Sequence, residues 1–125
     1  KGQGFQPPPV QQPRIPSWVA GAWPHQRPMR RAARWDGVVP LVVGGEMGFH
    51  EPDVDEFTQI VAYVNTQRTT PGNFDYVAAG SRLMYGDADL DGLMAVGATW
   101  WMESIGYPGP TFDDWRDLIR DGPPT

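Results

Sequence analysis

The sequence predicts an α/β domain in which strands and helices alternate four times along the chain. Residues 15–40, IPSWVAGAWPHQRPMRRAARWDGVVP, hold a strand, a glycine, a short basic helix and a second strand, as a compact β-α-β unit does. A second unit of the same kind follows. Because no two neighbouring strands have the spacing of a hairpin, we expect parallel strands with right-handed crossovers. Four strand–helix units amount to half of a closed (β/α)8 barrel.

Local patterns define the first strand and helix. The strand is predicted at residues 17–20 and is ended by Gly21, and Pro28 falls in the first helical turn, where its missing N–H is tolerated. The apolar face of this helix holds Met29, Ala32 and Ala33. We interpret the opposite, arginine-rich face as solvated, with docking to a partner as the alternative. That face holds Arg30, Arg31 and Arg34.

The next strand follows a predicted turn at Asp36 and Gly37. Residues 38–43 are a continuous apolar run, as expected for a strand buried on both faces. The glycine-rich segment 44–52 is predicted as a loop.

The second helix has the clearest start signal in the chain. Asp53 and Glu56 have capping-box spacing, and the third strand is predicted at 74–79, with a loop at 80–86. The helix has apolar residues at i, i+3, i+4 and i+7. They are Phe57, Ile60, Val61 and Val64.

The last elements complete the alternation. A helix is predicted at 87–96, closed by Gly97, then a strand at 98–102 and a final helix capped by Thr111. The inner face of that helix is predicted to be Trp115, Leu118 and Ile119. We therefore divide the chain into a proline-rich extended lead-in, residues 1–14, and one domain, residues 15–125.

Composition excludes several classes of function. The net charge of −5 and the pI near 4.8 argue against a nucleic-acid partner, which needs a basic surface. The absence of cysteine excludes disulfides and thiolate-bound metals. No apolar run approaches the roughly 20 residues that span a bilayer, and no signal peptide is visible, so we expect a cytoplasmic protein without a membrane partner. Since the chain begins with Lys1, we expect it to be part of a longer protein.

A metal site is not expected. The aspartates of Asp87-Ala-Asp89-Leu-Asp91-Gly92 match the start of a calcium loop, but position twelve is Ala98 where a bidentate carboxylate is required. We interpret them as residues that favour a helix N-terminus. The two histidines are 25 residues apart and make no recognisable metal pair.

Three segments together resemble a known family. They are WVAG, RPMRRAARWDGVVPL and GATWWMES, in this order and at these spacings. They resemble the C-terminal half of the luciferase-like flavin-dependent oxidoreductases, also called bacterial luciferase-like monooxygenases. The resemblance runs from about Phe5 to Pro124.

This resemblance implies a fold, a cofactor and partners. Members of the family form a TIM-type (β/α)8 barrel that binds reduced FMN or coenzyme F420 at the carboxyl ends of its strands. The chain would supply strands five to eight of that barrel, with one wall of the pocket for a small-molecule substrate. The partner that it implies is the missing N-terminal half-barrel or a second copy of the chain.

The resemblance also suggests site residues. Gly21 and Ala22 would contact the flavin phosphate, with Arg27 as a charge partner, because a glycine between a strand and a helix start presents free N–H groups to an anion. A plain strand-to-helix turn is the alternative. Trp23 and His25 would line the flavin or substrate pocket.

No residue is identified as a catalytic base. The weak candidates are His25 and Glu103, and Glu103 either points into the mouth of the barrel or caps a turn. The alternative to an enzyme is a non-catalytic half-barrel module that self-associates or pairs with another chain.

Overall fold

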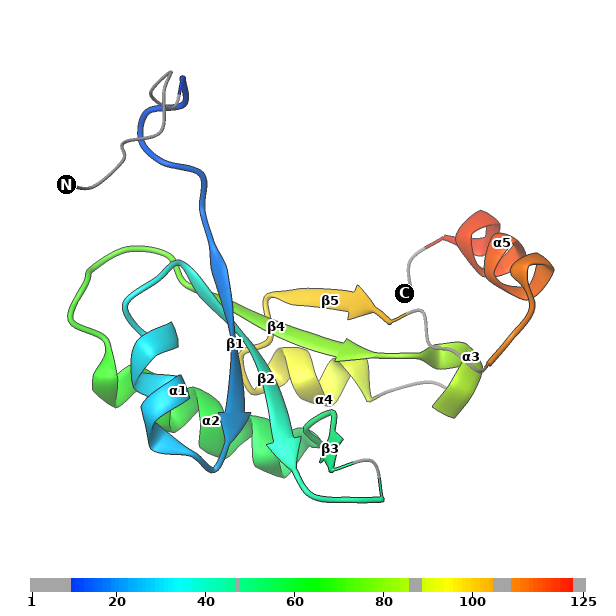
Figure 1. Ribbon diagram of the computed structural model, residues 1–125, viewed down its shortest axis with the longest axis horizontal. Helices are drawn as coiled ribbons and strands as arrows, with labels where there is room; N and C mark the ends of the chain where they lie inside the picture. The colour runs from blue at the N-terminus through cyan, green and yellow to red at the C-terminus, as the bar shows by residue number, and fades with distance from the viewer. Residues whose placement is uncertain (1–9, 47, 86–88, 105–108, 123–125) are drawn as a thin grey trace, which may run out of the picture.

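The computed structural model describes residues 10–46, 48–85, 89–104 and 109–122 (Figure 1). Strands and helices alternate as the sequence predicts, with two additional short elements, β3 and α3. The elements are β1 (Trp18–Trp23), α1 (Gln26–Ala32), β2 (Gly37–Val43), β3 (Phe49–His50), α2 (Val54–Gln67), β4 (Asp75–Gly80), α3 (Arg82–Tyr85), α4 (Leu90–Ala95), β5 (Trp100–Glu103) and α5 (Phe112–Asp121).

The main strands form a parallel sheet in the order β1-β2-β4-β5. Consecutive parallel strands are therefore neighbours, and helices connect them, which confirms the predicted α/β class. The longest pairing joins β1 to β2, from Trp18 opposite Gly37 to Trp23 opposite Val42.

The prediction that no hairpin exists is wrong. Within the segment predicted as a loop, β3 turns back and pairs antiparallel with the end of β2, with Val42 opposite His50 and Val43 opposite Phe49. Because β1 pairs with Val42 from one side, β3 occupies the other side, where β4 would otherwise continue. The pairing of β4 with β2 covers only Gly37 and Val38, so these two strands are paired at their amino ends alone.

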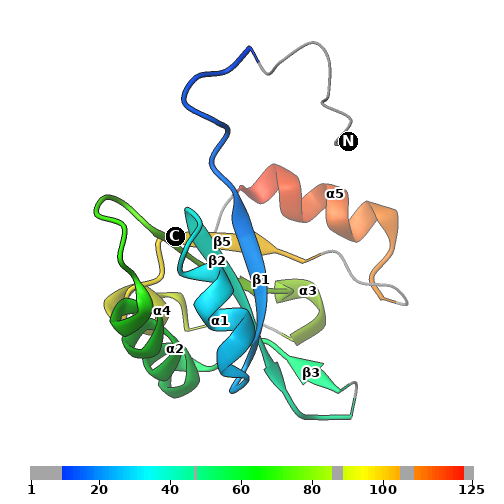
Figure 2. The same cartoon turned by 60° about the vertical axis from the view of Figure 1, so that its left-hand side comes forward.

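One face of the sheet is covered by α1, α2 and α4 (Figure 2). The predicted stripe of α2 is confirmed, since Phe57, Ile60 and Val64 are fully buried. Asp53 and Glu56 form the predicted capping box at its start, with the Glu56 amide 2.8 Å from Asp53 Oδ1. The core also takes residues from the two other helices and from the strands. They are Met29, Ala32, Ala33, Val38, Val42, Phe74, Tyr76, Ala78 and Leu93.

The other face of the sheet is apolar, and no helix among the described residues covers it. Side chains alternate between the faces of a strand, so the neighbours of the core residues point to this second face. Val77 is buried there. Four of the others are 39–54% exposed, namely Trp18, Val43, Trp100 and Met102. A parallel sheet normally buries both faces, so this surface has the character of an interior.

Two tryptophans cross the second face at the amino ends of the strands. The Trp18 indole reaches from β1 across Gly37 of β2 and donates to Asp75 of β4 at 2.9 Å. Its ring centroid lies 5.3 Å from that of Trp100, on the opposite edge strand β5. Neighbouring strands are about 4.8 Å apart, so the two indoles together span the width of the four-stranded sheet at this end.

Residues 35–37 hold this crossing in place. Asp36 accepts hydrogen bonds from the Ser17 amide at 2.6 Å and from the Arg14 guanidinium at 2.6 and 3.1 Å. Arg14 also lies over the Trp35 ring, at 5.0 Å. Gly37 is the first residue of β2 and not a turn residue as predicted, and its lack of a side chain makes room for the Trp18 ring.

Several element limits differ from those predicted. The strand β1 runs three residues beyond Ala20, and α3 lies in the segment predicted as a loop. In α5, Trp115 is buried and Thr111 caps the first turn as predicted, but Ile119 is 72% exposed and so does not belong to an inner face. In Figure 1, α5 extends beyond the end of β5.

Gly37→Ala is expected to destabilise the fold by about 2–3 kcal/mol, because overpacking of a filled site costs this much. A Cβ at this position would lie 2.6 Å from Trp18 Cδ1 and 2.7 Å from the Asp75 carbonyl oxygen. The control is Gly21→Ala, whose Cβ would meet only the flexible end of Met29 at 3.0 Å. Urea unfolding followed by far-UV circular dichroism measures both, and a larger loss for Gly21→Ala would contradict this account.

Candidate functional site

The carboxyl end of β1 was predicted to be a phosphate-binding turn, and the structure differs there. Gly21 and Ala22 lie inside β1, paired opposite Pro40 and Leu41. Gly21 is buried and faces Met29 of α1, so neither residue lies in a turn with free amides. Ala22 is half-buried and points to the second face, since it alternates with Gly21.

The other residues predicted for the cofactor site, Trp23, His25 and Arg27, do not all lie in one place. Trp23, the last residue of β1, packs against Tyr63 of α2 with ring centroids 5.6 Å apart. His25 is the residue before α1, is exposed, and makes no capping hydrogen bond with its side chain. Arg27 follows in the first turn and is also exposed. The structure therefore places His25 and Arg27 together at the β1–α1 connection and Trp23 in the core.

Glu103, at the carboxyl end of β5, is held by three donors. Its Oε1 accepts from the Arg82 amide at 2.7 Å, and its Oε2 accepts from Arg82 Nε at 2.9 Å and from the Trp101 indole at 3.1 Å. Trp101 in turn lies against Gly80 of β4, where a Cβ would be 2.6 Å from the indole. Glu103 thus ties the end of β5 to the start of α3.

These contacts keep Glu103 ionised. Burial alone would raise the pKa of Glu103, but the bonds from the Arg82 amide, the Trp101 indole and the Arg82 guanidinium, together with the guanidinium charge, lower it. A carboxylate with a lowered pKa and three donors is a weak proton acceptor near neutral pH. Of the two alternatives for this residue, the geometry favours the capping role.

His25 and Glu103 are not brought together within one chain. They follow β1 and β5, which are the opposite edges of the sheet with β2 and β4 between them. Neither residue therefore has the other as a proton-transfer partner in this chain.

Sequence reasoning missed the Ser81 hydroxyl and the contact of His50, a weaker catalytic candidate than His25, with Glu56. The Ser81 hydroxyl, directly after β4, is buried and has no hydrogen-bond partner among the described residues. His50 of β3 lies 3.1 Å from Glu56 Oε2, the same oxygen that accepts from the Asp53 amide. A capping box in sequence identifies Glu56, but no local signal shows that His50 meets it, because β3 was not predicted.

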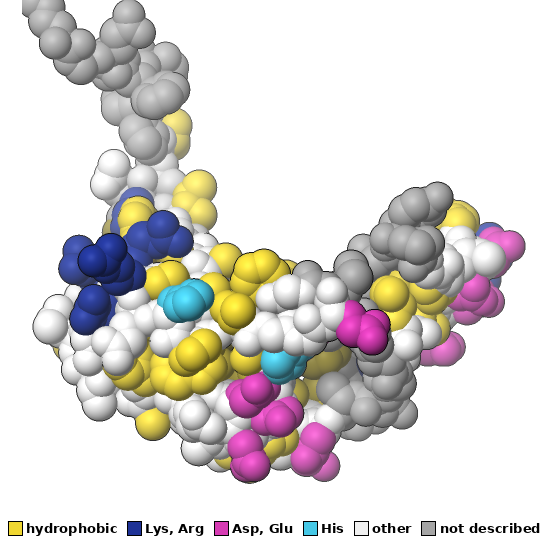
Figure 3. All heavy atoms as spheres, turned by 60° about the horizontal axis from the view of Figure 1, so that its bottom comes forward, with side chains coloured by type: hydrophobic (Ala, Val, Ile, Leu, Met, Phe, Trp, Pro, Cys, Tyr) yellow, Lys and Arg dark blue, Asp and Glu magenta, His cyan; other side chains and the backbone are white. Residues whose placement is uncertain are grey.

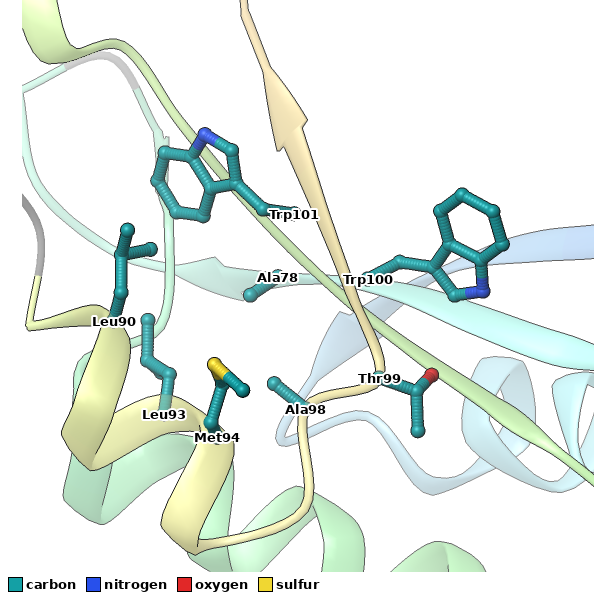
Figure 4. Close-up of a pocket in the computed structure, with 8 residues that line it drawn as sticks. All are labelled: Ala78, Leu90, Leu93, Met94, Ala98, Thr99, Trp100 and Trp101. Atoms are coloured by element: carbon teal, nitrogen blue, oxygen red, sulfur yellow. The ribbon is translucent and has the colours of Figure 1, made fainter. Parts of the chain in front are cut away.

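A cavity of about 310 Å³ lies between α4 and β5 (Figure 4). Its lining is apolar apart from Thr99, whose Oγ1 is 2.9 Å from the Tyr76 amide. Trp101 and Trp100 project to opposite sides of β5. The lining residues are Ala78, Leu90, Leu93, Met94, Ala98, Thr99, Trp100 and Trp101. This cavity suits an apolar group and holds no acid or base.

The described ranges contain neither a metal-ligand cluster nor a helix that could span a membrane. No group of three His, Asp or Glu side chains there is placed to hold a metal ion. Asp89, from the segment that matches a calcium loop, instead caps α4 by accepting from the Gly92 amide at 2.8 Å, and Asp87 lies outside the described residues. None of the helices in this part of the chain has the length and apolar character needed to cross a bilayer.

Comparison of the chain with protein-family models, with curated proteins and with solved structures found no match.

Glu103→Gln is expected to lower the free energy of unfolding at neutral pH by about 1.5–3 kcal/mol, the usual value of hydrogen bonds to a charged group. Because the folded state lowers the pKa of Glu103, its contribution is complete at neutral pH and disappears as the pH falls below 4.5 through that lowered pKa. Urea unfolding at several pH values between 7 and 3 measures the difference in the free energy of unfolding between the variant and the wild type. Glu46→Gln, at an exposed carboxylate, is the control, and a difference independent of pH would contradict this account.

Proposed function

We propose that the chain is the C-terminal part of a luciferase-like flavin-dependent oxidoreductase or monooxygenase, whose parallel strands are half of a (β/α)8 barrel. The contact between Trp18 and Trp100 carries this proposal, because it joins side chains of the two edge strands across an apolar face that no helix among the described residues covers. The second, uncovered face would then be the interior of the barrel.

The segments that resemble the family also meet in space. WVAG lies in β1, RPMRRAARWDGVVPL runs from α1 through β2, and GATWWMES spans β5. Trp18, Gly37 and Trp100 come from these three segments and form the crossing at the amino ends. Segments whose contacting residues, Trp18 and Trp100, are 82 positions apart therefore contribute to one packing unit, which supports treating them as a single signature.

The carboxyl end of the second face fits the ring system of FMN or coenzyme F420. Both edge tryptophans that cross this face do so at the amino ends, whereas the carboxyl ends present small or flexible apolar residues. They are Ala22, Val43, Ala79 and Met102. Such a surface accepts a flat aromatic ring and excludes water from it.

Residues at the β1–α1 connection would complete the cofactor site. Arg27 carries a positive charge for the phosphate, and His25 beside it would contact the substrate or the ring. A bound flavin would supply the redox chemistry, and the chain would supply orientation and apolar surroundings. We assign no catalytic acid or base, since Glu103 is engaged with Arg82.

A non-catalytic half-barrel module is the second candidate. The separation of His25 and Glu103 on opposite edges of the sheet favours it, because one chain alone does not bring these two candidates together.

Titration with FMN and with coenzyme F420, followed by quenching of cofactor fluorescence, tests the enzymatic proposal. Ala22→Trp is expected to raise the dissociation constant by about tenfold or more, because the indole would occupy the space proposed for the flavin ring. A tenfold change corresponds to about 1.4 kcal/mol of binding free energy. Position 21 is unsuitable for this test, because a bulky side chain there would meet Met29.

Gln59→Trp, at an exposed position on the opposite, helix-covered side, is the control and should bind like the wild type. Failure of the wild-type chain to bind either cofactor would exclude the flavin proposal. Undiminished binding by Ala22→Trp would exclude this location.

A further inference from the structure

We infer that the partner of the open sheet is a second copy of this chain, which closes the barrel around a two-fold axis parallel to the strands. The basic edge formed by β1 and α1 of each copy would face the acidic edge formed by β5, α4 and α5 of the other. This inference rests on the half-barrel part of the proposed function, with a second copy in the place of the N-terminal half-barrel, and is independent of flavin.

Strand direction permits this arrangement. All four main strands are parallel, and within the described residues the outer sides of β1 and β5 have no partner strand. A two-fold axis along the strands keeps the strands of both copies pointing the same way, so β5 of one copy can pair in parallel with β1 of the other. The axis repeats this pairing, which leaves no open edge and forms a closed dimer.

Charge is divided between the two edges. Residues 24–34, around α1, contain four arginines and no carboxylate. Residues 89–95 and 111–122, around α4 and α5, contain six aspartates and two arginines. Figure 3 shows a group of basic side chains at one end of the molecule and acidic side chains in the middle and at the other end, where a few basic side chains lie among them. Two-fold closure places each basic edge against an acidic one, and this complementarity favours a second copy as the occupant.

Apolar surface near the acidic edge also lacks a cover. Phe112 and Ile119 of α5 are 78% and 72% exposed, and Met94 of α4 is 68% exposed. The helix after the last strand of a β/α unit packs between that strand and the next one. In the dimer, α5 would lie between its own β5 and the β1 strand of the second copy, where these side chains become buried.

The dimer would also complete the site. Since β5 of one copy neighbours β1 of the other, Met102 of the first copy comes to the same face and the same end of the barrel as Ala22 of the second, near His25 and Arg27 of that second copy. Each of the two equivalent sites would then contain residues from both copies, which a single chain keeps apart.

Sedimentation equilibrium of the full chain at low and high salt is the first test. We expect a dimer whose dissociation constant rises about tenfold or more between 50 mM and 500 mM salt, because ionic strength screens charges across the interface. A folded monomer at all concentrations would overturn the inference, as would higher oligomers that grow with concentration.

Charge exchange tests the arrangement itself. The double variant Arg30→Glu/Arg34→Glu and the double variant Asp117→Lys/Asp121→Lys should each be folded monomers, since all four positions are exposed. Asp121→Lys places a cation at the end of α5, where it is favourable, and Asp117→Lys removes exposed ion pairs with Arg116 and Arg120, which contribute little to stability. Mixing the two restores opposite charges at both interfaces, so an equimolar mixture should form a heterodimer. Circular dichroism verifies the fold of each variant.

Gln59→Glu on α2, exposed and away from both edges, is the control and should dimerise as the wild type does. If the two double variants remain dimeric, or if they fail to associate when mixed, the basic and acidic edges are not the ones that meet in the dimer. Dimerisation without binding of FMN or coenzyme F420 would retain this inference and reject the enzymatic function. A monomer that binds flavin would reject this inference and retain the enzymatic function.

Discussion

The passage of the Trp18 indole over Gly37 is the constraint on which the rest of the sheet depends. It fixes the register of β1, β2 and β4 at their amino ends through the hydrogen bond to Asp75. It also brings the indole to Trp100 of the far edge strand, 5.3 Å between ring centroids. A side chain at position 37 would collide with the Trp18 ring and the Asp75 backbone, so the crossing depends on the missing Cβ at this position.

The two ends of the strands have different physical roles. At the amino ends, aromatic packing and the Arg14–Asp36 ion pair at 2.6 Å hold neighbouring segments together. At the carboxyl ends, β2 and β4 are no longer paired, and Glu103 and Arg82 instead connect β5 to α3 through polar contacts. Rigidity is thus concentrated away from the end where β/α barrels place their functional groups.

Features with a local cause could be predicted from the sequence, and those with a distant cause could not. The capping box at Asp53 and the buried stripe of α2 depend on residues within two helical turns. The two-residue strand β3 is too short to show a period, and Gly21 was taken for a strand end because nothing local shows that it faces Met29. Glu103 meets Arg82 from 21 positions away, a pairing that only the parallel sheet creates.

Arg31 protects the edge strand β1 from pairing with foreign strands. Its guanidinium donates to the Ala20 carbonyl at 3.4 Å, so this side chain has to turn away before another strand can pair with β1 at that position. Charged residues at strand edges hinder indiscriminate addition of foreign strands, whereas β5, with its exposed Trp100 and Met102, has no such guard. The edge strand β1 is therefore protected from pairing with foreign strands and the edge strand β5 is not. Aggregation by strand addition should begin at β5.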